Sequence, residues 1–362
     1  MTKTVSILIS RQGRHPCRTT PWIVQLEKAI QWLKRKPYRL YTSIGQQTWE
    51  MQLYFARQAY LDQTIVIPAK NATDFEILKQ NVITQYCLDL NQVQFEKIYP
   101  DDSKSLMYSR DARIIENSDL LVPIAIRNNG YLNTLINQAP HQKHIINDFQ
   151  IEYKPEKAKI AYKIDKNKLS KELFFLSSQY LTHWTRTSNS PWPTEKKFDY
   201  YQAITTNNCY PRSAFEGLAN MLTHGKINAS SLHMPQNTPT VSFSGLPPQE
   251  AAVLMYWRAR YCQMSFEPYG IGIEKNDAES IGIQAVRYYK PRFKPKNVDS
   301  WLCQSIGKKS NWRLENEYRF LGDLDLIHIP NEKMICFCYS KNEAKKIQNR
   351  FGIRSIGMID VL

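Results

Sequence analysis

Apolar residues in the first part of the chain alternate between short continuous runs and runs with helical spacing. The continuous runs at 5–9, 64–68 and 120–126 have the length and composition of buried strands, whereas the apolar spacing over 22–33 predicts an amphipathic helix. The same pattern predicts strands at 38–41 and 93–98, and helices ending near Tyr60, over 73–80 and over 103–117. Strands and helices that alternate at these lengths predict a doubly wound, mostly parallel α/β sheet.

The pattern changes after residue 150. A lysine-rich stretch predicts a linker over 151–178, and beyond it the strands are shorter and aromatic residues and prolines more frequent. We therefore expect a Rossmann-like domain over 1–150 and an α+β, β-rich domain over 179–362. The elements predicted in the second domain are strands at 180–186, 240–244, 266–273, 285–289, 312–320 and 334–339 and helices at 215–222 and 250–260.

The segment 312–320 concentrates ionisable residues on one face. Because side chains alternate across a strand, a strand here would place Glu315, Glu317 and Arg319 on the same side. The opposite side would carry the core residues Trp312, Leu314, Tyr318 and Phe320. Three ionisable groups are costly to bury, so we expect the polar face to line a cleft or to meet solvent. A surface strand with an internal carboxylate–arginine pair is the alternative interpretation.

The charge of the chain favours anionic partners. The formal net charge is +15, from 48 Lys and Arg against 33 Asp and Glu. Residues 151–362 hold 30 of these basic and 20 of these acidic residues, and so supply +10 of the charge. An excess of this size favours nucleotides, nucleic acid or a phosphorylated ligand as partners.

Other sequence signals limit the location and the chemistry. No apolar run is long enough to span a membrane and no cleavage pattern follows the first strand, so we expect a cytoplasmic protein without a membrane partner. The seven cysteines are scattered and form no C-x-x-C pair. We therefore expect neither a disulfide scaffold nor a metal site.

Three predicted strands of the first domain end in loops suited to phosphate. Glycine, hydroxyl or arginine residues follow the strands in each loop, and ligands of doubly wound sheets bind beyond the carboxyl ends of the strands. The candidate nucleotide-binding residues in these loops are Ser10, Arg11, Ser43, Gly45, Arg127 and Gly130.

These residues give the first 145 residues a resemblance to the SLOG superfamily of Rossmann-like domains. The superfamily includes DNA-processing recombination mediators and lysine-decarboxylase-like phosphoribohydrolases. The similarity lies in Ser10-Arg11, the Ser43-Ile44-Gly45 turn and the segment Arg110–Asp119. It implies that Arg110 is a further nucleotide-binding residue. Gln46, Gln47 and Trp49 stand where that superfamily has further glycines. The resemblance therefore implies binding of a nucleotide or nucleotide-derived ligand, and not hydrolysis.

The second domain closely resembles an uncharacterised bacterial domain family and, more distantly, the ADP-ribosyltransferase fold. The shared motifs are His183-Trp184-Thr185, Ser242-Phe243-Ser244 and Trp312 to Arg319. The resemblance implies that NAD is a substrate, that Glu317 stabilises the ribosyl cation, that Glu315 orients or deprotonates the acceptor, and that His183 holds the ribose. The remaining NAD-binding residues that it implies are Thr185, Ser242, Ser244 and Arg319, with Arg186 as an alternative to His183.

Together the two resemblances predict a nucleotide-sensing effector that cleaves NAD or transfers ADP-ribose, for instance in defence against phage. Two alternatives stay open. The first is a non-enzymatic nucleotide- or nucleic-acid-binding protein related to recombination mediators. The second is a Mg²⁺-dependent nuclease, because Asp323 and Asp325 follow Glu315 and Glu317 closely and hard cations prefer several oxygen ligands.

Overall fold

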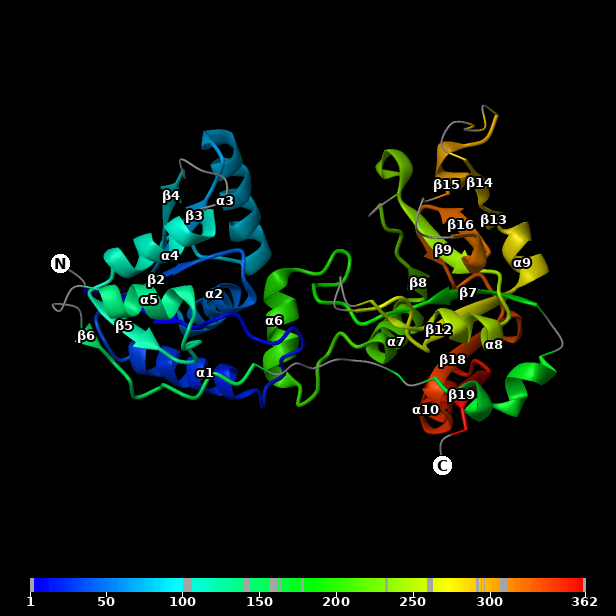
Figure 1. Ribbon diagram of the computed structural model, residues 1–362, viewed down its shortest axis with the longest axis horizontal. Coiled ribbons are helices and arrows are strands. Elements are labelled where there is room, and N and C mark those ends of the chain that lie inside the picture. The colour runs from blue at the N-terminus through cyan, green and yellow to red at the C-terminus, as the bar shows by residue number, and fades with distance from the viewer. Residues whose placement is uncertain are drawn as a thin grey trace. The chain divides into compact units, whose positions relative to one another are not determined.

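In the computed structural model the chain forms two compact units (Figure 1). Unit 1 contains residues 1–158 and 189–211, and unit 2 contains 159–188 and 212–362. The residues that the structure describes are 3–99, 106–139, 144–155, 162, 164–176, 179–231, 234–258, 263–290, 293, 295, 297–306 and 312–360. Within them no helix has the length and apolar composition that crossing a membrane requires.

Unit 1 is a Rossmann-like α/β structure built on six parallel strands in the order β4-β3-β2-β1-β5-β6. The order reverses direction between β1 and β5, which makes their carboxyl ends the topological switch point of the sheet. The strands are β1 (Lys3–Leu8), β2 (Tyr38–Ser43), β3 (Gln63–Pro68), β4 (Val93–Ile98), β5 (Leu120–Pro123) and β6 (His144–Ile145).

Helices cover both faces of this sheet. The helices are α1 (Pro21–Leu33), α2 (Gln47–Ala59), α3 (Ala72–Tyr86), α4 (Leu106–Glu116), α5 (Tyr131–Gln138) and α6 (Lys197–Thr206). Ile7 and Val122 pack with α1, α2 and α3 on one face, whereas Leu8 and Leu121 pack with α4 and α5 on the other. The predicted doubly wound parallel sheet is confirmed, and the predicted residues 103–105 of α4 lie outside the described residues.

Residues 189–211 pack with unit 1 although they follow β7 in sequence. Tyr200, Tyr201 and Ile204 of α6 are buried in the core of unit 1. Glu50 of α2 accepts hydrogen bonds from Lys197 Nζ at 2.7 Å and from the Tyr201 hydroxyl at 2.8 Å. The sequence predicts a single linker, whereas the chain passes three times from one unit to the other.

Unit 2 is a mixed, β-rich α+β structure around a seven-stranded sheet with the order β13-β16-β9-β7-β12-β18-β19. All neighbours are antiparallel except β18 and β19. The strands are β7 (Tyr180–Trp184), β9 (Thr240–Ser244), β12 (Gly270–Glu274), β13 (Gln284–Ala285), β16 (Glu317–Leu321), β18 (Met334–Ser340) and β19 (Ser355–Ile359).

Short strand pairs and helices complete unit 2. The pairs are β10 (Trp257–Arg258) with β11 (Gln263–Met264), β14 (Arg287–Tyr289) with β15 (Cys303–Ser305), and β8 (Lys226–Ile227) with β17 (Leu324–Asp325). The helices are α7 (Ala214–His224), α8 (Pro248–Ala251), α9 (Lys275–Ser280) and α10 (Lys341–Phe351). Residues of α7 and α10 pack on the face that carries Phe243, and residues of α8 on the face that carries Trp184.

Two predicted elements differ in the structure. The segment 312–320 is a short 3₁₀ turn over Trp312–Glu315 followed by β16, because Asn316 has a φ of 45° and breaks the extended chain. Leu314 is therefore 60% exposed and not in the core, and the Trp312 side chain lies outside the described residues. The predicted helix 250–260 is only α8 and a 3₁₀ turn to Leu254, followed by β10.

Candidate active site

The polar residues of β9 and β16 face one another across paired strands. Glu317 is opposite Ser244, Arg319 is opposite Ser242, and Ser244 is in turn opposite Thr182 of β7. Residues that are directly opposite in a sheet project to the same face. The structure therefore brings the predicted residues Ser242, Ser244, Glu317 and Arg319 together.

The carboxylate of Glu317 is held in one orientation. Its Oε1 accepts hydrogen bonds from the Ser242 hydroxyl at 2.9 Å and from Arg319 Nε at 2.8 Å. Its Oε2 accepts a third from Arg319 Nη2 at 3.0 Å. A bidentate arginine fixes both the position and the charge of a carboxylate. Glu317 is thus a preoriented anion next to Ser242.

Arg319 is buried, with 2% of its surface exposed. Besides Glu317, it donates from Nη1 to the Trp301 carbonyl at 2.7 Å and from Nη2 to Gln304 Oε1 at 2.8 Å. A buried guanidinium group is stable only when acceptors such as these bind most of its N–H groups. Arg319 is therefore fully committed to the protein, and it positions Glu317 instead of contacting NAD itself as the resemblance implies.

Glu315 lies on the turn before β16 and not on the strand. Its backbone carbonyl accepts a hydrogen bond from the Ser244 hydroxyl at 3.0 Å, which ties this turn to β9. Burial and the nearby Glu317 carboxylate raise the pKa of Glu315 to about 7, against the opposing effects of Arg258 and Arg319. The two carboxylates therefore differ: the Glu317 carboxylate is ion-paired, and Glu315 exchanges its proton near neutral pH.

This pKa makes the stability of unit 2 depend on pH. The pKa of Glu315 rises from 4.5 to about 7 on folding, so between these values the folded chain binds more protons than the unfolded chain. The contribution of Glu315 to stability is then greatest below pH 4.5 and is lost as the pH rises through 7, by at most about 3.5 kcal/mol. Urea unfolding at pH 5 and pH 7.5 should show this loss in the wild type and a smaller one in Glu315→Gln. Equal pH dependence of the two proteins would contradict it.

Arg258 on β10 is close enough to Glu315 for its charge to lower the pKa of that carboxyl group. Arg186 interacts in turn with the charges of Arg258 and Glu267. The chain after β7 is anchored by Glu267, which accepts hydrogen bonds from Thr187 N at 2.7 Å and Thr187 Oγ1 at 3.0 Å. The sequence predicts Arg186 as a site residue but does not predict Arg258. The position of Arg258 near Glu315 depends on the short strand pair β10–β11, which no local sequence pattern reveals.

His183 and Thr185 face away from this cluster. Thr182 is opposite Ser244, so His183 projects to the other face of the sheet, where its ring lies 5.8 Å from that of Phe243. Its Nδ1 is 2.8 Å from the Ser242 carbonyl oxygen, and burial lowers the pKa of His183. The Thr185 hydroxyl donates to the carbonyl of Ala214, at the start of α7. These two predicted residues are not joined to the carboxylates.

The predicted nuclease cluster is not formed by the described residues. Asp323 accepts a hydrogen bond from Ala229 N at 2.7 Å and pairs with Lys226 Nζ at 2.9 Å. Asp325 lies on β17, which pairs with β8. In the described part of the chain no three His, Cys, Asp or Glu side chains are placed to hold a metal ion.

The predicted loops of unit 1 meet at the switch point between β1 and β5. The Ser10 hydroxyl accepts a hydrogen bond from Arg127 N at 3.0 Å, and Ser10 N donates to the Ala125 carbonyl at 3.0 Å. The side chains of Arg11 and Arg127 are exposed. Gly130 lies in the tight turn before α5, where a Cβ atom would be 3.0 Å from the Arg127 carbonyl oxygen. Basic groups are thus present at the expected ligand position of the sheet.

The other predicted residues of unit 1 hold the loop after β2. Arg110 is fully buried over the Trp49 ring, donates from Nη1 to the Ile44 carbonyl at 2.8 Å and pairs with Asp111. Gly45 has a φ of +90°, and Met107 of α4 packs against it. The Ser43 hydroxyl donates to the Val66 carbonyl. Arg110 and Ser43 therefore shape this loop and do not project from it.

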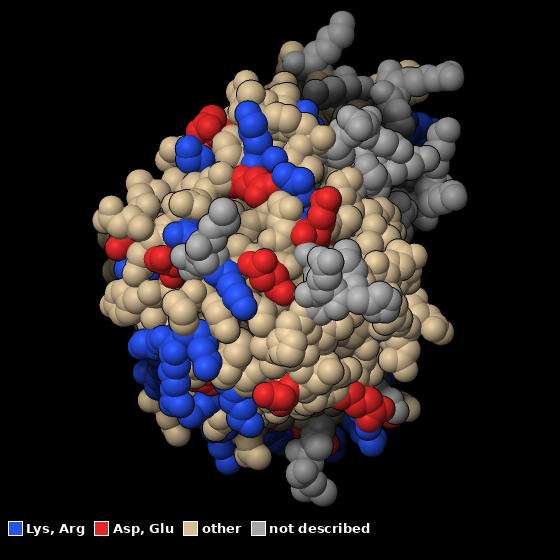
Figure 2. All heavy atoms as spheres, turned by 90° about the vertical axis from the view of Figure 1, so that its left-hand side faces the viewer, with Lys and Arg blue, Asp and Glu red and all other residues tan. Residues whose placement is uncertain are grey.

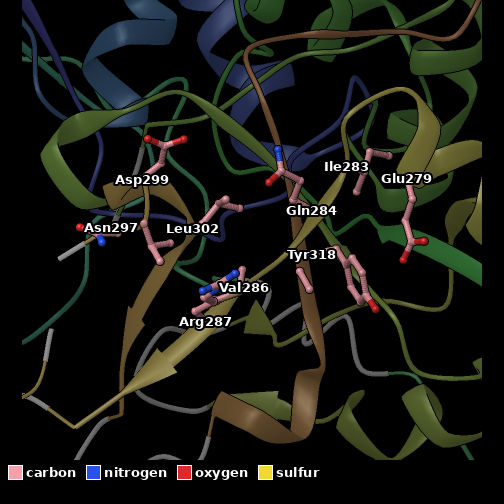
Figure 3. A pocket seen from close by; sticks show the side chains of 11 residues that line it. Glu279, Ile283, Gln284, Val286, Arg287, Asn297, Asp299, Leu302 and Tyr318 are labelled. Atoms are coloured by element: carbon pink, nitrogen blue, oxygen red, sulfur yellow. The ribbon is translucent and has the colours of Figure 1, made fainter. Parts of the chain in front are cut away.

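A cavity of about 750 Å³ lies elsewhere in unit 2. Its lining includes Gln284 and Ala285 of β13, Leu302 and Tyr318 (Figure 3). Tyr318 is on the opposite face of β16 from Glu317 and Arg319. None of the predicted site residues lines this cavity.

Figure 2 views unit 1 and shows Lys and Arg side chains gathered at the lower left of that face, with acidic side chains beside them and over the rest of the face. The exposed basic residues that follow α1 are Lys34, Arg35 and Lys36. Such a surface is suited to an anionic partner.

No known protein family model matches the chain, and no curated protein matches its sequence. Among solved structures, the chain is similar to DNA processing protein A (DprA) from Streptococcus pneumoniae, with 12% sequence identity and a TM-score of 0.30. The match covers 40% of this chain and 49% of that one, so it spans about half of that structure. A TM-score of 0.30 is too low to assign a fold or a function.

Proposed function

We propose that unit 2 cleaves the bond between nicotinamide and ribose in NAD and passes ADP-ribose to water or to another acceptor. The observation that carries this proposal is the pairing of a fixed carboxylate, Glu317, with a carboxyl group that titrates near pH 7, Glu315. Cleavage moves the bonding electron pair to nicotinamide and leaves positive charge on the ribose. The acceptor oxygen then bonds to this carbon and loses its proton.

Glu317 stabilises the ribosyl cation in this proposal. A carboxylate that is already oriented by Ser242 and Arg319 needs no reorganisation when charge develops on the ribose. It interacts more strongly with the cation of the transition state than with the ribose of the bound substrate. This difference is what lowers the barrier.

Glu315 acts as the general base. A pKa of about 7 leaves a substantial fraction of the group ionised at neutral pH and still basic enough to take a proton from the acceptor. Nicotinamide release should therefore rise with pH through this range.

Arg186 and Arg258 bind the pyrophosphate of NAD, as guanidinium groups are suited to phosphate oxygens. Replacing Arg186 with alanine should raise KM for NAD roughly tenfold with little change in kcat, because the lost contact is made equally in the ground and transition states. Steady-state kinetics of Arg186→Ala and of Arg287→Ala, an exposed arginine on β14, measure this effect. An unchanged KM in Arg186→Ala would remove this residue from the NAD site.

Unit 1 binds a nucleotide or nucleotide-derived ligand at the switch point, with Arg11 and Arg127 contacting phosphate. The reversal of strand order between β1 and β5 and the resemblance of Ser10-Arg11 and the Ser43–Gly45 turn to SLOG domains support this assignment. The protein would then be a sensor joined to an effector. A role in defence against phage stays a prediction from that pairing.

The experiment that tests the function is incubation of the purified protein with NAD and chromatographic measurement of free nicotinamide. The reaction is run alone, with a panel of nucleotides and with nucleic acid, since the ligand of unit 1 can be required for turnover. Release under any of these conditions supports the proposal. No release under all of them contradicts it.

Nucleic-acid binding without catalysis is the second candidate. It is favoured by the net charge of +15, of which residues 151–362 supply the larger part. This candidate would be supported if the protein bound DNA or RNA with an affinity that falls steeply with salt concentration and did not turn over NAD.

A further inference from the structure

Tyr288 of β14 contacts the backbone of Glu317 just beyond the end of β13. Val286, the residue after β13, donates from its N–H to the Glu317 carbonyl at 2.9 Å. In a regular antiparallel pair Glu317 N–H would return this bond to the Val286 carbonyl. It donates to the Tyr288 hydroxyl at 3.2 Å instead. The Tyr288 hydroxyl therefore replaces a strand carbonyl beside Glu317.

The strand that carries Tyr288 is joined to the residues that hold Arg319. Tyr288 is paired with Gln304 in the parallel pair of β14 and β15, and Gln304 Oε1 accepts a hydrogen bond from Arg319 Nη2 at 2.8 Å. Arg319 in turn binds both oxygens of the Glu317 carboxylate. The position of the Tyr288 ring is thus fixed relative to the Glu317 backbone and to the arginine that orients its side chain.

The Tyr288 hydroxyl keeps a proton that the protein does not use. The bond from Glu317 N occupies an acceptor position of this hydroxyl and leaves its own O–H free to donate. No acceptor for it is present among the residues that the structure describes. Burial raises the pKa of Tyr288 to about 12, and the Glu317 and Glu315 charges act in the same direction, so the proton is present at neutral pH.

A sugar bound beside Glu317 needs such a donor. Ionised carboxylates only accept hydrogen bonds, and the Ser242 hydroxyl and the Arg319 guanidinium already donate to Glu317. Tyr288, Glu315 and Glu317 are each half-buried, so they retain surface that a ligand can contact. Because Glu317 must lie next to the ribose to stabilise its cation, a donor fixed on the Glu317 backbone lies next to the ribose as well.

We propose that Tyr288 binds the substrate, with its hydroxyl donating a hydrogen bond to a hydroxyl oxygen of the nicotinamide ribose. The proposal rests on the NAD-cleaving function proposed above for unit 2, and it adds the group that recognises the ribose.

The test measures NAD binding by titration calorimetry to the full chain carrying Glu317→Gln, which should leave NAD intact. NAD is compared with two analogues, which lack either the 2′- or the 3′-hydroxyl of the nicotinamide ribose. At least one analogue should bind about tenfold more weakly than NAD, since the Tyr288 hydroxyl is left without its acceptor. This comparison involves no change at Tyr288 and so does not depend on the folding of a Tyr288 variant.

Adding Tyr288→Phe to this chain should weaken NAD binding about tenfold and abolish the difference between NAD and that analogue, because both changes remove the same hydrogen bond. If the hydroxyl served only as the acceptor for Glu317 N, its loss would weaken NAD and both analogues alike and the difference would persist. Adding Tyr289→Phe instead, which removes the next hydroxyl on β14, should leave all three affinities unchanged.

The outcomes separate this assignment from the function on which it rests. If NAD binds and neither analogue differs from it, or if the difference persists with Tyr288→Phe, Tyr288 does not bind the ribose and the proposed function stands. If NAD does not bind at all, the proposed function fails together with this assignment.

Discussion

Replacing Glu317 with glutamine lowers nicotinamide release from NAD by about 10²–10³-fold, the usual cost of removing one preoriented electrostatic group from an active site. Glutamine has nearly the same shape, and its amide oxygen can still accept from Arg319, but it has no charge to stabilise the ribosyl cation. The effect should therefore appear in kcat with little change in KM.

The matched control is Glu332→Gln, which removes an exposed carboxylate of the same unit. Its turnover should equal that of the wild type. Circular dichroism and urea unfolding establish whether Glu317→Gln is folded. A folded Glu317→Gln protein that retains turnover within twofold of the wild type would exclude Glu317 from the chemistry.

Replacing Arg319 with methionine lowers the free energy of unfolding of unit 2 by about 3–5 kcal/mol, because it leaves a partly buried carboxylate without its partner. The 2% exposure of Arg319 and its bonds to Glu317, Trp301 and Gln304 identify it as the group that balances the charge of this cluster. Urea unfolding monitored by the signal of unit 2 measures the change.

Two further variants give this prediction its controls. Arg313→Met changes an exposed arginine on the turn before β16 and should alter stability by less than about 0.5 kcal/mol. The double variant Glu317→Met with Arg319→Met removes both charges and should recover much of the loss, as apolar replacement of a buried pair often does. A loss below about 1 kcal/mol for Arg319→Met alone would show that the pair is not needed for the fold.

The sheet of unit 1 could be predicted because its strands are locally encoded. Strands buried on both faces are continuous apolar runs such as 64–68, and the intervening helices have apolar residues at helical spacing. The association of residues 189–211 with unit 1 could not be predicted in this way. It depends on Tyr200, Tyr201 and Ile204 finding a core whose other members are distant in sequence.

Only those residues of the candidate site that lie on one regular strand could be predicted to share a face. Glu317 and Arg319 are two residues apart on one strand, so their shared face follows from the sequence. Glu315 does not follow the same periodicity, because Asn316 adopts a positive φ and ends the extended chain there. The orientation of His183 depends on the register of β7 against β9, which is set by non-local pairing.

Buried arginines show a further limit of sequence reasoning. Arg110 is predicted to bind a nucleotide because it lies in the segment that resembles SLOG domains. In the structure its guanidinium lies over Trp49 and bonds to the Ile44 carbonyl, so it supports the loop from within. An arginine in sequence gives no sign of whether its acceptors are ligand or protein atoms.

A crystal structure of Glu317→Gln grown with NAD shows directly whether NAD binds beside β16, since the variant is expected to leave the substrate intact. We expect density for NAD with the nicotinamide ribose next to residue 317 and Ser242, and the pyrophosphate next to Arg186 and Arg258. NAD bound elsewhere, or a site that stays empty at saturating NAD, would contradict it.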